Sequence, residues 1–256
     1  MLRIFAVLLS VILWTVSAGA VQGYDVVKVE NGATLKGTVN FTGSVPADET
    51  IVINADADYC GKEQKVGKYL VSDSKVQNVV VWIEGIEKGK VLPKKEVDVA
   101  IKNCRAVPHV NVGFVGGEYV FKNEDEILHT VQSKLGLAYQ KKASSRPLQD
   151  GTSIYNLALP KTGHEVKKPV KRWHRYTEDT GFIQIRSNTH NWIRGYIFVF
   201  DHPYAAVTDQ YGAFEMDGLP AGDYVLKVWH EGFGMQEKKI SVKSGKSTEV
   251  EIAFAK

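Results

Sequence analysis

The chain has 256 residues, of which 44% are hydrophobic, and its 32 basic and 29 acidic side chains leave a formal net charge of +3. This length is enough for one large β domain or two small ones. Outside one basic segment the charges are mixed, which excludes the footprint of a nucleic-acid-binding protein. The sequence also lacks His-Glu-x-x-His, Gly-x-Ser-x-Gly, P-loop and dinucleotide-binding motifs, so we expect no enzymatic activity.

The first two dozen residues have the pattern of a secretory signal peptide. Arg3 precedes an almost wholly apolar run from Ile4 to Val16, and residues 17–20 end in a small-x-small pattern that predicts cleavage near Ala20. The apolar run is shorter than the roughly 20 residues that span a bilayer. We therefore expect a periplasmic or extracellular protein with no transmembrane segment after cleavage, and an uncleaved anchor helix is the alternative.

Almost every segment that follows has the character of a β-strand. Residues 26–42 alternate apolar and polar side chains, and residues 76–84 and 96–102 are two further apolar runs separated by Gly, Lys and Pro. Residues 110–121 predict a hairpin with a Gly-Gly turn. No stretch shows helical periodicity over a dozen residues, so the sequence predicts an all-β protein.

Cys60 and Cys104 are the two cysteines of the chain. In an oxidising compartment a lone pair most simply forms a disulfide. Closing a loop of this length stabilises a protein by roughly 3–4 kcal/mol in the chain-entropy model. The alternative, a metal-ligating cysteine, finds little support because neither cysteine has a histidine two or three residues away.

Residues 133–180 differ from the rest of the chain. Several pairs of basic residues and turn formers lie between short apolar runs such as 154–159. This composition predicts a long, basic, irregular excursion from the β scaffold. Loops of this length are uncommon unless they are functional or disordered. A solvated loop and a surface for an acidic partner are the two interpretations.

The residues after Gly195 form a series of short alternating strands. Turn-forming segments at 209–212, 218–222 and 243–246 separate them. Regular spacing of strands and turns is typical of a β-sandwich. A second domain is therefore expected to begin near residues 195–205.

Residues 207–231, VTDQYGAFEMDGLPAGDYVLKVWHE, carry a D-x-x-G-x-F turn, a G-x-P-x-G-x-Y turn and a strand that ends in Trp-His-Glu. This series resembles the carboxypeptidase regulatory-like (transthyretin-like) β-sandwich module. In the resembled family the module is an accessory domain, so the resemblance implies no peptidase activity.

The middle of the chain resembles a cupredoxin. Residues 103–131 match a Cys-x₃-Pro-His-Val start, a glycine turn and an Asn-x-Asp-x₃-His-x-Val segment, and residues 154–160 resemble the segment that precedes the ligand loop. Together the motifs are similar to exported bacterial proteins that fuse a plastocyanin/amicyanin-like domain to such a sandwich, some labelled methylamine-utilisation proteins. The resemblance implies a cupredoxin-like Greek-key β-sandwich at 24–196, with the basic insertion at about 133–180, and a carboxypeptidase regulatory-like β-sandwich at 197–256.

The resemblance places the two histidine ligands of the family on His129 and His190. The intact loop would run Cys-Asp-x-His-Pro-Trp-Met, whereas residues 187–193 are Ser-Asn-Thr-His-Asn-Trp-Ile. Ser187 and Ile193 thus stand where type 1 copper needs a thiolate and a weak axial thioether. We therefore expect type 1 copper and electron transfer to be lost. Copper or zinc at His129 and His190 stays a candidate, and a hydrogen-bonded remnant is the alternative.

Two observations would strengthen a metal site at this histidine pair. Their ring nitrogens would have to lie about 3–4 Å apart to share one ion. Glu124, Asp125 and Glu126 directly precede His129 and are the nearest candidates for an oxygen ligand, although alternate side chains of a strand point away.

Three other histidines form a second candidate site. Each occurs in a motif of the resembled family that is independent of the copper loop, and each has an equally simple role in holding a turn. Neighbouring Tyr204 and Trp229 favour the packing role. The three residues are His109, His202 and His230.

Three functional hypotheses follow. The first is an exported, non-enzymatic cupredoxin-like binding or assembly protein that associates with a redox partner such as a cytochrome, or with cell-surface material. The second is a residual copper- or zinc-binding protein that uses His129 and His190. The third is an extracellular structural or carbohydrate-contacting β-sandwich, for which eleven tyrosines and five tryptophans offer stacking surfaces but no specific motif.

Overall fold

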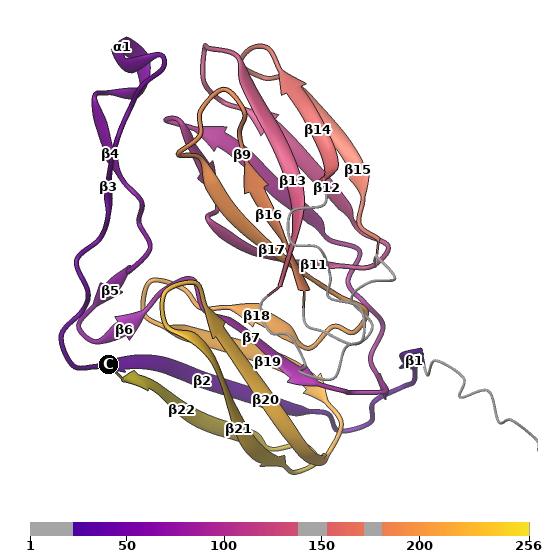
Figure 1. Cartoon of the computed structure of the whole chain (residues 1–256). Helices are drawn as coiled ribbons and strands as arrows, with labels where there is room; N and C mark the ends of the chain where they lie inside the picture. Colours follow the sequence, from indigo (N-terminus) through magenta and orange to yellow (C-terminus); the bar gives the residue numbers. More distant parts are fainter. Residues whose placement is uncertain (1–22, 138–152, 172–180, 256) are drawn as a thin grey trace, which may run out of the picture.

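The computed structural model describes residues 23–137, 153–171 and 181–255. Strands dominate these residues and form two stacked β-sandwiches (Figure 1), which confirms the predicted all-β fold class. The expected signal peptide at 1–20 lies outside the described residues. Within them, no helix is long and apolar enough to cross a membrane.

The upper sandwich in Figure 1, here called the first sandwich, consists of two sheets. One sheet has the order β10-β9-β12-β15, with β9 (Glu96–Lys102), β10 (Arg105–Val107), β12 (Glu118–Asn123) and β15 (Glu165–Pro169). The other has the order β11-β17-β16-β13-β14, with β11 (Val110–Phe114), β13 (His129–Leu137), β14 (Ser153–Leu159), β16 (Gly181–Arg186) and β17 (Arg194–Phe200). Two of the neighbouring pairs, β9–β12 and β11–β17, are parallel, so their connections cross between sheets rather than close as hairpins.

Alternating side chains fill the interior of the first sandwich. In β9, Val97, Val99 and Ile101 point into the core, and Glu96, Asp98 and Lys102 on the other face of the strand are exposed. The expected irregular excursion at 133–180 is wrong for its described parts. Residues 153–159 alternate in burial and pair along their length with β13, and β15 pairs with β12, because both segments complete sheet edges.

The second sandwich combines strands from both ends of the chain. One sheet has the order β18-β7-β20-β21, with β7 (Val80–Glu84), β18 (Ala205–Val207), β20 (Gly222–His230) and β21 (Gly234–Val242). The other contains β2 (Ala33–Thr42), β5 (Val71–Ser72), β6 (Lys75–Val76), β19 (Ala213–Leu219) and β22 (Ser247–Ala255). Strand β2 runs parallel to β22 over nine register pairs from Thr34–Ser247 to Thr42–Ala255. A short parallel pair, β1 (Asp25–Val26) with β8 (Lys88–Gly89), lies apart from both sheets.

Strand pairing crosses the expected domain boundary between residues 196 and 197. Strands β2 and β7, expected in the first domain, are hydrogen-bonded within the second sandwich, and β17 spans the boundary inside the first. The physical reason is the core: Leu35 and Ile83 are fully buried in the same cluster as Phe254. Without β2 and β7 the C-terminal strands would leave one face of that core open to water. A single cut in the chain therefore does not separate the two sandwiches.

An aromatic cluster joins the two sandwiches. Trp229 of the second sandwich lies between Phe182 and Phe198 of the first, with ring centroids 5.5 Å and 4.8 Å away. Trp82 contacts Phe198 from the neighbouring strand at 5.8 Å. Buried aromatic contacts of this kind are worth about 0.5–1.5 kcal/mol each beyond their area burial, so they hold the two sandwiches in a fixed relation.

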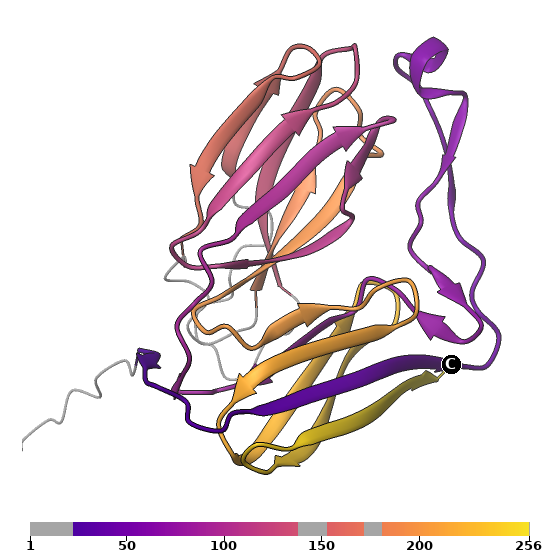
Figure 2. The same ribbon diagram turned by 180° about the vertical axis from the view of Figure 1, so that it is seen from behind.

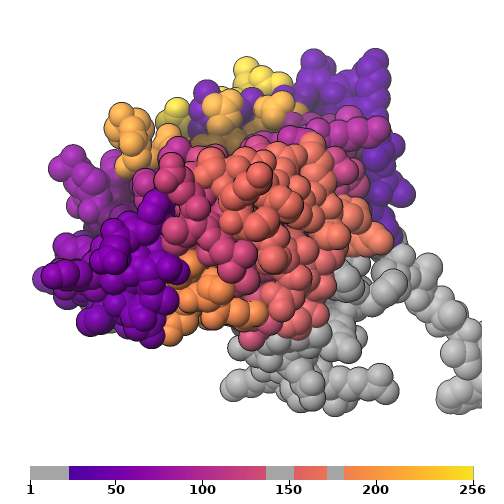
Figure 3. Space-filling view, turned by 90° about the horizontal axis from the view of Figure 1, so that it is seen from above, coloured from indigo at the N-terminus to yellow at the C-terminus, as the bar shows by residue number. Residues whose placement is uncertain are grey.

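Residues 43–70, here called the arm, leave the second sandwich after β2 and extend along the first (Figures 1 and 2). They carry the hairpin strands β3 (Thr50–Val52) and β4 (Glu63–Lys65), with the single-turn helix α1 (Ala57–Cys60) at the tip. Seen from above, the arm forms a lobe against the first sandwich (Figure 3). Its tip is tied there by the disulfide between Cys60 and Cys104, which confirms the predicted pairing.

Candidate metal centre

The two predicted histidine ligands meet inside the first sandwich. His129 opens β13 and His190 lies in the loop between β16 and β17. Their Nδ1 atoms face each other at 2.9 Å, and both side chains are fully buried. Two nitrogens on one ion at about 2.0–2.1 Å each lie roughly 3.3 Å apart at a tetrahedral angle. The rings would therefore separate by only a few tenths of an ångström to share a cation.

The outer nitrogen of each ring is bonded to a carboxylate. His129 Nε2 lies 2.9 Å from Oδ2 of Asp125, and His190 Nε2 lies 2.8 Å from Oδ2 of Asp56. An ionised carboxylate only accepts hydrogen bonds, so both Nε2 atoms carry a proton and both Nδ1 atoms present their lone pairs to each other. The 2.9 Å contact then requires one further proton shared between the Nδ1 atoms. A metal cation that replaced this proton would lie between the same two nitrogens.

Asp125 is fixed by the backbone around the disulfide. Its carboxylate, in a side chain only 2% exposed, accepts hydrogen bonds from the backbone N–H groups of Asn103 and Cys104 at 2.7 and 2.8 Å. Both of those residues adopt left-handed backbone conformations, with φ of 51° and 56°, which turns their N–H groups toward the carboxylate. Of the three acidic residues before His129, Asp125 thus reaches the site through His129, whereas Glu124 points outward to Lys102.

Asp56 comes from the tip of the arm. It precedes α1 in a left-handed conformation, with φ of 49°, and its side chain is about half exposed at 52%. Sequence reasoning missed this residue, because it lies in a segment with no motif of the resembled family. The predicted disulfide was the available signal for Asp56, since it links Cys60 at the end of α1 to Cys104 and so brings the arm tip close to the site.

Burial keeps His129 suited to act as a ligand. It lowers the pKa of His129 below its ordinary value, and the neighbouring His190 lowers it further, while Asp125 opposes both effects. A lowered pKa favours the neutral ring, in which Nδ1 keeps its lone pair at neutral pH.

The positions of the missing sulfur ligands have taken structural roles. Ser187 Oγ accepts a hydrogen bond from His190 N at 3.1 Å and contacts the hydroxyl groups of Thr130 and Thr189 at the same distance. Ile193 is 1% exposed and packs in the core of the first sandwich. This donor set does not fit type 1 copper, which needs a thiolate. Thr189 Oγ1, 3.2 Å from His190 Nδ1, is the hydroxyl that lies beside the imidazole pair.

A second group of metal-ligand side chains overlaps the first. Ligand atoms of Cys104, Asp125 and His129 lie within 4.8 Å of one another. The sulfur of Cys104 is bonded to Cys60, however, so it offers no thiolate while the disulfide is intact. The imidazole pair is therefore the stronger donor set.

The histidines of the second candidate site each have local partners. His109 bonds Glu231 and the carbonyl of Arg194, and His202 stacks with Tyr204 at 6.3 Å. His230 stacks on Phe233 at 4.5 Å. Burial lowers the pKa of His230 to about 4. Among the described residues, no group of three ligand side chains includes any of these histidines.

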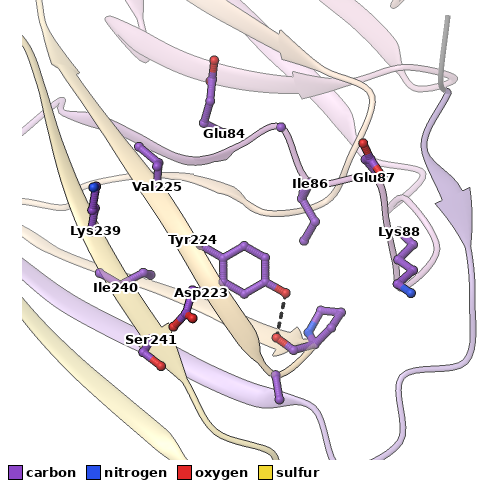
Figure 4. Close-up of a pocket in the computed structure, with 13 residues that line it drawn as sticks. Glu84, Ile86, Glu87, Lys88, Asp223, Tyr224, Val225, Lys239, Ile240 and Ser241 are labelled. Carbon is purple, nitrogen blue, oxygen red and sulfur yellow. Dashed lines mark hydrogen bonds between the residues drawn. The ribbon is translucent and has the colours of Figure 1, made fainter.

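A separate cavity of about 830 Å³ lies in the second sandwich between the β7–β8 connection and the β20–β21 hairpin. Figure 4 shows the ring of Tyr224 in the middle of its lining residues, with the hydroxyl donating to the carbonyl of Pro220 at 2.9 Å. Pro220 and Tyr224 belong to the G-x-P-x-G-x-Y turn, whereas none of the candidate histidine ligands lines this cavity.

Comparison with known proteins gives a family-model match for the C-terminal residues and similar solved structures that cover less than half of the chain. A family model for the carboxypeptidase regulatory-like domain matches residues 197–255. These residues form a carboxypeptidase regulatory-like segment. The structure adds that this segment uses β2 and β7 from the N-terminal half to complete its sandwich. A search of curated proteins finds no significant match.

Solved structures similar to this chain at low identity include two cupredoxins and a copper-containing nitrite reductase. Amicyanin from Paracoccus versutus is 13% identical, with 47% of this chain and 97% of amicyanin covered and a TM-score of 0.28. A purple cupredoxin from Nitrosopumilus maritimus is 18% identical, with 40% and 98% covered and a TM-score of 0.27. A Cu-containing nitrite reductase from Thermus scotoductus is 19% identical, with 44% of this chain covered and a TM-score of 0.28, and this chain spans 24% of that enzyme's length.

Proposed function

We propose that this protein is an exported, non-enzymatic metal-binding protein that holds one divalent cation, copper(II) or zinc(II), on Nδ1 of His129 and His190. The observation that supports this proposal is the 2.9 Å contact between the two Nδ1 atoms, with a carboxylate on each opposite nitrogen. Metal-bound histidines usually donate their second ring N–H to a carboxylate or carbonyl in this way, which fixes the tautomer and raises the basicity of the ligand.

Charge balance supports the same proposal. With one proton shared between the rings, the imidazole pair carries a single positive charge against the two carboxylates of Asp56 and Asp125. A divalent cation in place of that proton neutralises both carboxylates. Of the two carboxylates only that of Asp125 is buried, and buried charge is unfavourable unless it is compensated. A divalent ion bound between the buried imidazoles would therefore lower the electrostatic cost of the site.

The ligand chemistry favours copper(II) or zinc(II) over other ions. Imidazole suits both, and copper(II) binds nitrogen donors more tightly than zinc(II) in the usual order of affinities. With Ser187 and Ile193 at the sulfur positions, the proposal includes no type 1 copper and no electron transfer. The hydroxyl of Thr189, 3.2 Å from His190 Nδ1, would be the nearest further donor for the ion.

An exported location is part of the proposal. The signal-peptide pattern at 1–20 supports it, and so does the disulfide between Cys60 and Cys104, because such bonds persist in oxidising compartments.

Metal titration of the demetallated full chain tests the proposal. We expect about one equivalent of copper(II) or zinc(II) to survive desalting, and copper(II) EPR to show nitrogen coupling without the intense blue absorption of a copper–thiolate bond. His129→Gln and His190→Gln should each remove the binding. His164→Gln, which alters a histidine of the turn before β15, serves as the matched control. Retention of no metal, or equal binding by all three variants, would contradict the proposal.

A further inference from the structure

A second cavity lies where the arm meets both sandwiches. Its volume is about 370 Å³, within the range of small-molecule sites. The arm supplies Ile51, Gly67 and Leu70 to its wall, and the first sandwich supplies Arg105 and Arg194. The cavity is separate from the histidine pair, although it adjoins the same loop through Trp192 and Ile193.

The charged side chains that line this cavity are cationic, and His109 lies among them. Arg105, Arg194 and Lys65 contribute positive charges, and no Asp or Glu is among the lining residues. The Nε of Arg194 is buried without an acceptor among the described residues. A buried guanidinium N–H with no partner is unfavourable, so this atom calls for an acceptor that the described protein does not supply.

Two further observations concern the arginines around this cavity. Arg105 reaches toward the arm, with Nη1 3.8 Å from the position that a Cβ at Gly67 would take. Arg186 is the cross-strand partner of Arg194 in the β16–β17 ladder. Like charges directly opposite each other destabilise a sheet. An anion at Arg194 would relieve that repulsion.

The rest of the wall is apolar. Ile51, Leu70, Trp192 and Ile193 line the cavity, and Leu70 is 41% exposed. An inorganic anion would leave this apolar surface in contact with water. An organic anion covers it and meets the guanidinium groups at the same time.

We propose that this cavity binds a small organic monoanion, a carboxylate on an apolar or aromatic body. The guanidinium groups of Arg105 and Arg194 bind the carboxylate, because their planar donor pairs match its two oxygens. Trp192, Ile51 and Leu70 contact the apolar body. The site is independent of the proposed metal centre, since it uses neither His129 nor His190.

Calorimetric titration of the full chain with a graded series of probes tests this proposal. The probes are acetate, benzoate, 3-phenylpropionate and the neutral isostere benzamide. We expect benzoate or 3-phenylpropionate to bind at least about 10-fold more tightly than acetate, because burial of apolar surface adds to the charge contact. Benzamide should not bind, since it lacks the charge.

Substitutions at the two arginines test whether benzoate binds in this cavity. Arg105→Gln and Arg194→Gln should each weaken benzoate about 10- to 100-fold, the usual loss for a hydrogen bond to a charged group. Arg194→Lys keeps the charge but not the planar donor pair, and should give an intermediate loss. Lys243→Gln removes one exposed charge from a turn of the second sandwich and is the matched control. Circular dichroism and the ligand-free melting temperature of each variant establish that the fold is retained.

Three results would overturn the proposal. The first is that no carboxylate of the series binds below about 10 mM. In the second, benzamide binds as tightly as benzoate, which would show that the cavity recognises only an apolar body. In the third, folded Arg105 and Arg194 variants bind benzoate as the parent does, which would place the anion elsewhere.

Discussion

Asp56 accepts a hydrogen bond from His190 Nε2 at 2.8 Å, although 134 residues separate them in the sequence. The contact joins the arm, which leaves the second sandwich, to the degenerate ligand loop of the first. Because Asp125, four residues before His129, plays the same role for that ring, each imidazole is oriented by one carboxylate. The arm is thus part of the candidate metal centre and not merely a connection.

This relationship predicts that Asp56 tunes the affinity for metal. Asp56→Asn should weaken zinc(II) or copper(II) binding about 10- to 100-fold, because a carboxylate behind a metal-bound histidine raises its basicity and fixes its ring. Competition titration against a chelator of known affinity measures the change. Asp58→Asn, an exposed neighbour on α1, is the matched control and should leave the affinity unchanged. Equal affinities for Asp56→Asn and the parent would show that the contact has no role in binding.

The disulfide between Cys60 and Cys104 should support both stability and the metal centre. Replacing both cysteines by serine should lower the free energy of unfolding by about 3–4 kcal/mol, since the bond closes a loop of 44 residues. Urea denaturation measures this loss. The same variant should also bind metal more weakly, because the arm tip that carries Asp56 is released.

A double-mutant cycle separates the two effects of the disulfide. If the bond affects the metal only through Asp56, then Asp56→Asn adds no further loss of affinity in the variant without cysteines. Additive losses would show instead that the disulfide supports the site by another route, through Cys104 N and Asp125.

The two histidines that the resemblance pairs lie side by side in the structure. Strand β13 begins at His129, and the loop after β16 carries His190 together with Ser187 and Ile193 to the same end of the sandwich. That this pair holds a metal ion stays a prediction. No motif marks Asp56, since its position depends on the path of the arm rather than on periodicity, and the predicted disulfide between Cys60 and Cys104 is the one signal that places the arm tip near the site.

The domain boundary could not be predicted for a related reason. The alternation within residues 26–42 predicts a strand but does not say which sheet it joins. Strand β2 pairs with β22 because the C-terminal core needs Leu35 and Val39 to cover it. This pairing joins strands from the two ends of the described chain, and the motifs of the two families do not indicate it.

Introducing a thiolate and a thioether at positions 187 and 193 should turn the histidine pair into a site that forms a copper–thiolate bond. Ser187→Cys with Ile193→Met places a thiolate within reach of the histidine pair, since Ser187 Oγ already bonds the backbone of His190 at 3.1 Å. Addition of copper(II) to the double variant should give intense visible absorption from the copper–thiolate bond. Ile193→Met alone is the control and should stay without this band. A colourless double variant that still binds copper would show that the loop geometry has departed from that of a blue-copper site.

His230 should make the second sandwich sensitive to acid. Burial lowers its pKa to about 4 in the folded protein, against an ordinary value near 6.5. Between these two values the unfolded chain binds more protons than the folded one, so stability rises with pH from about 4 to 6.5 and is independent of this group above that range. The full shift from 6.5 to about 4 corresponds to about 3–4 kcal/mol. His230→Phe keeps the stacking on Phe233 and removes the titration, so its unfolding free energy should depend less steeply on pH in this window.

His164→Gln, which alters a histidine of a surface turn, is the control and should keep the parent slope in urea denaturation at the same pH values. A parent slope in His230→Phe would assign the acid sensitivity to other groups.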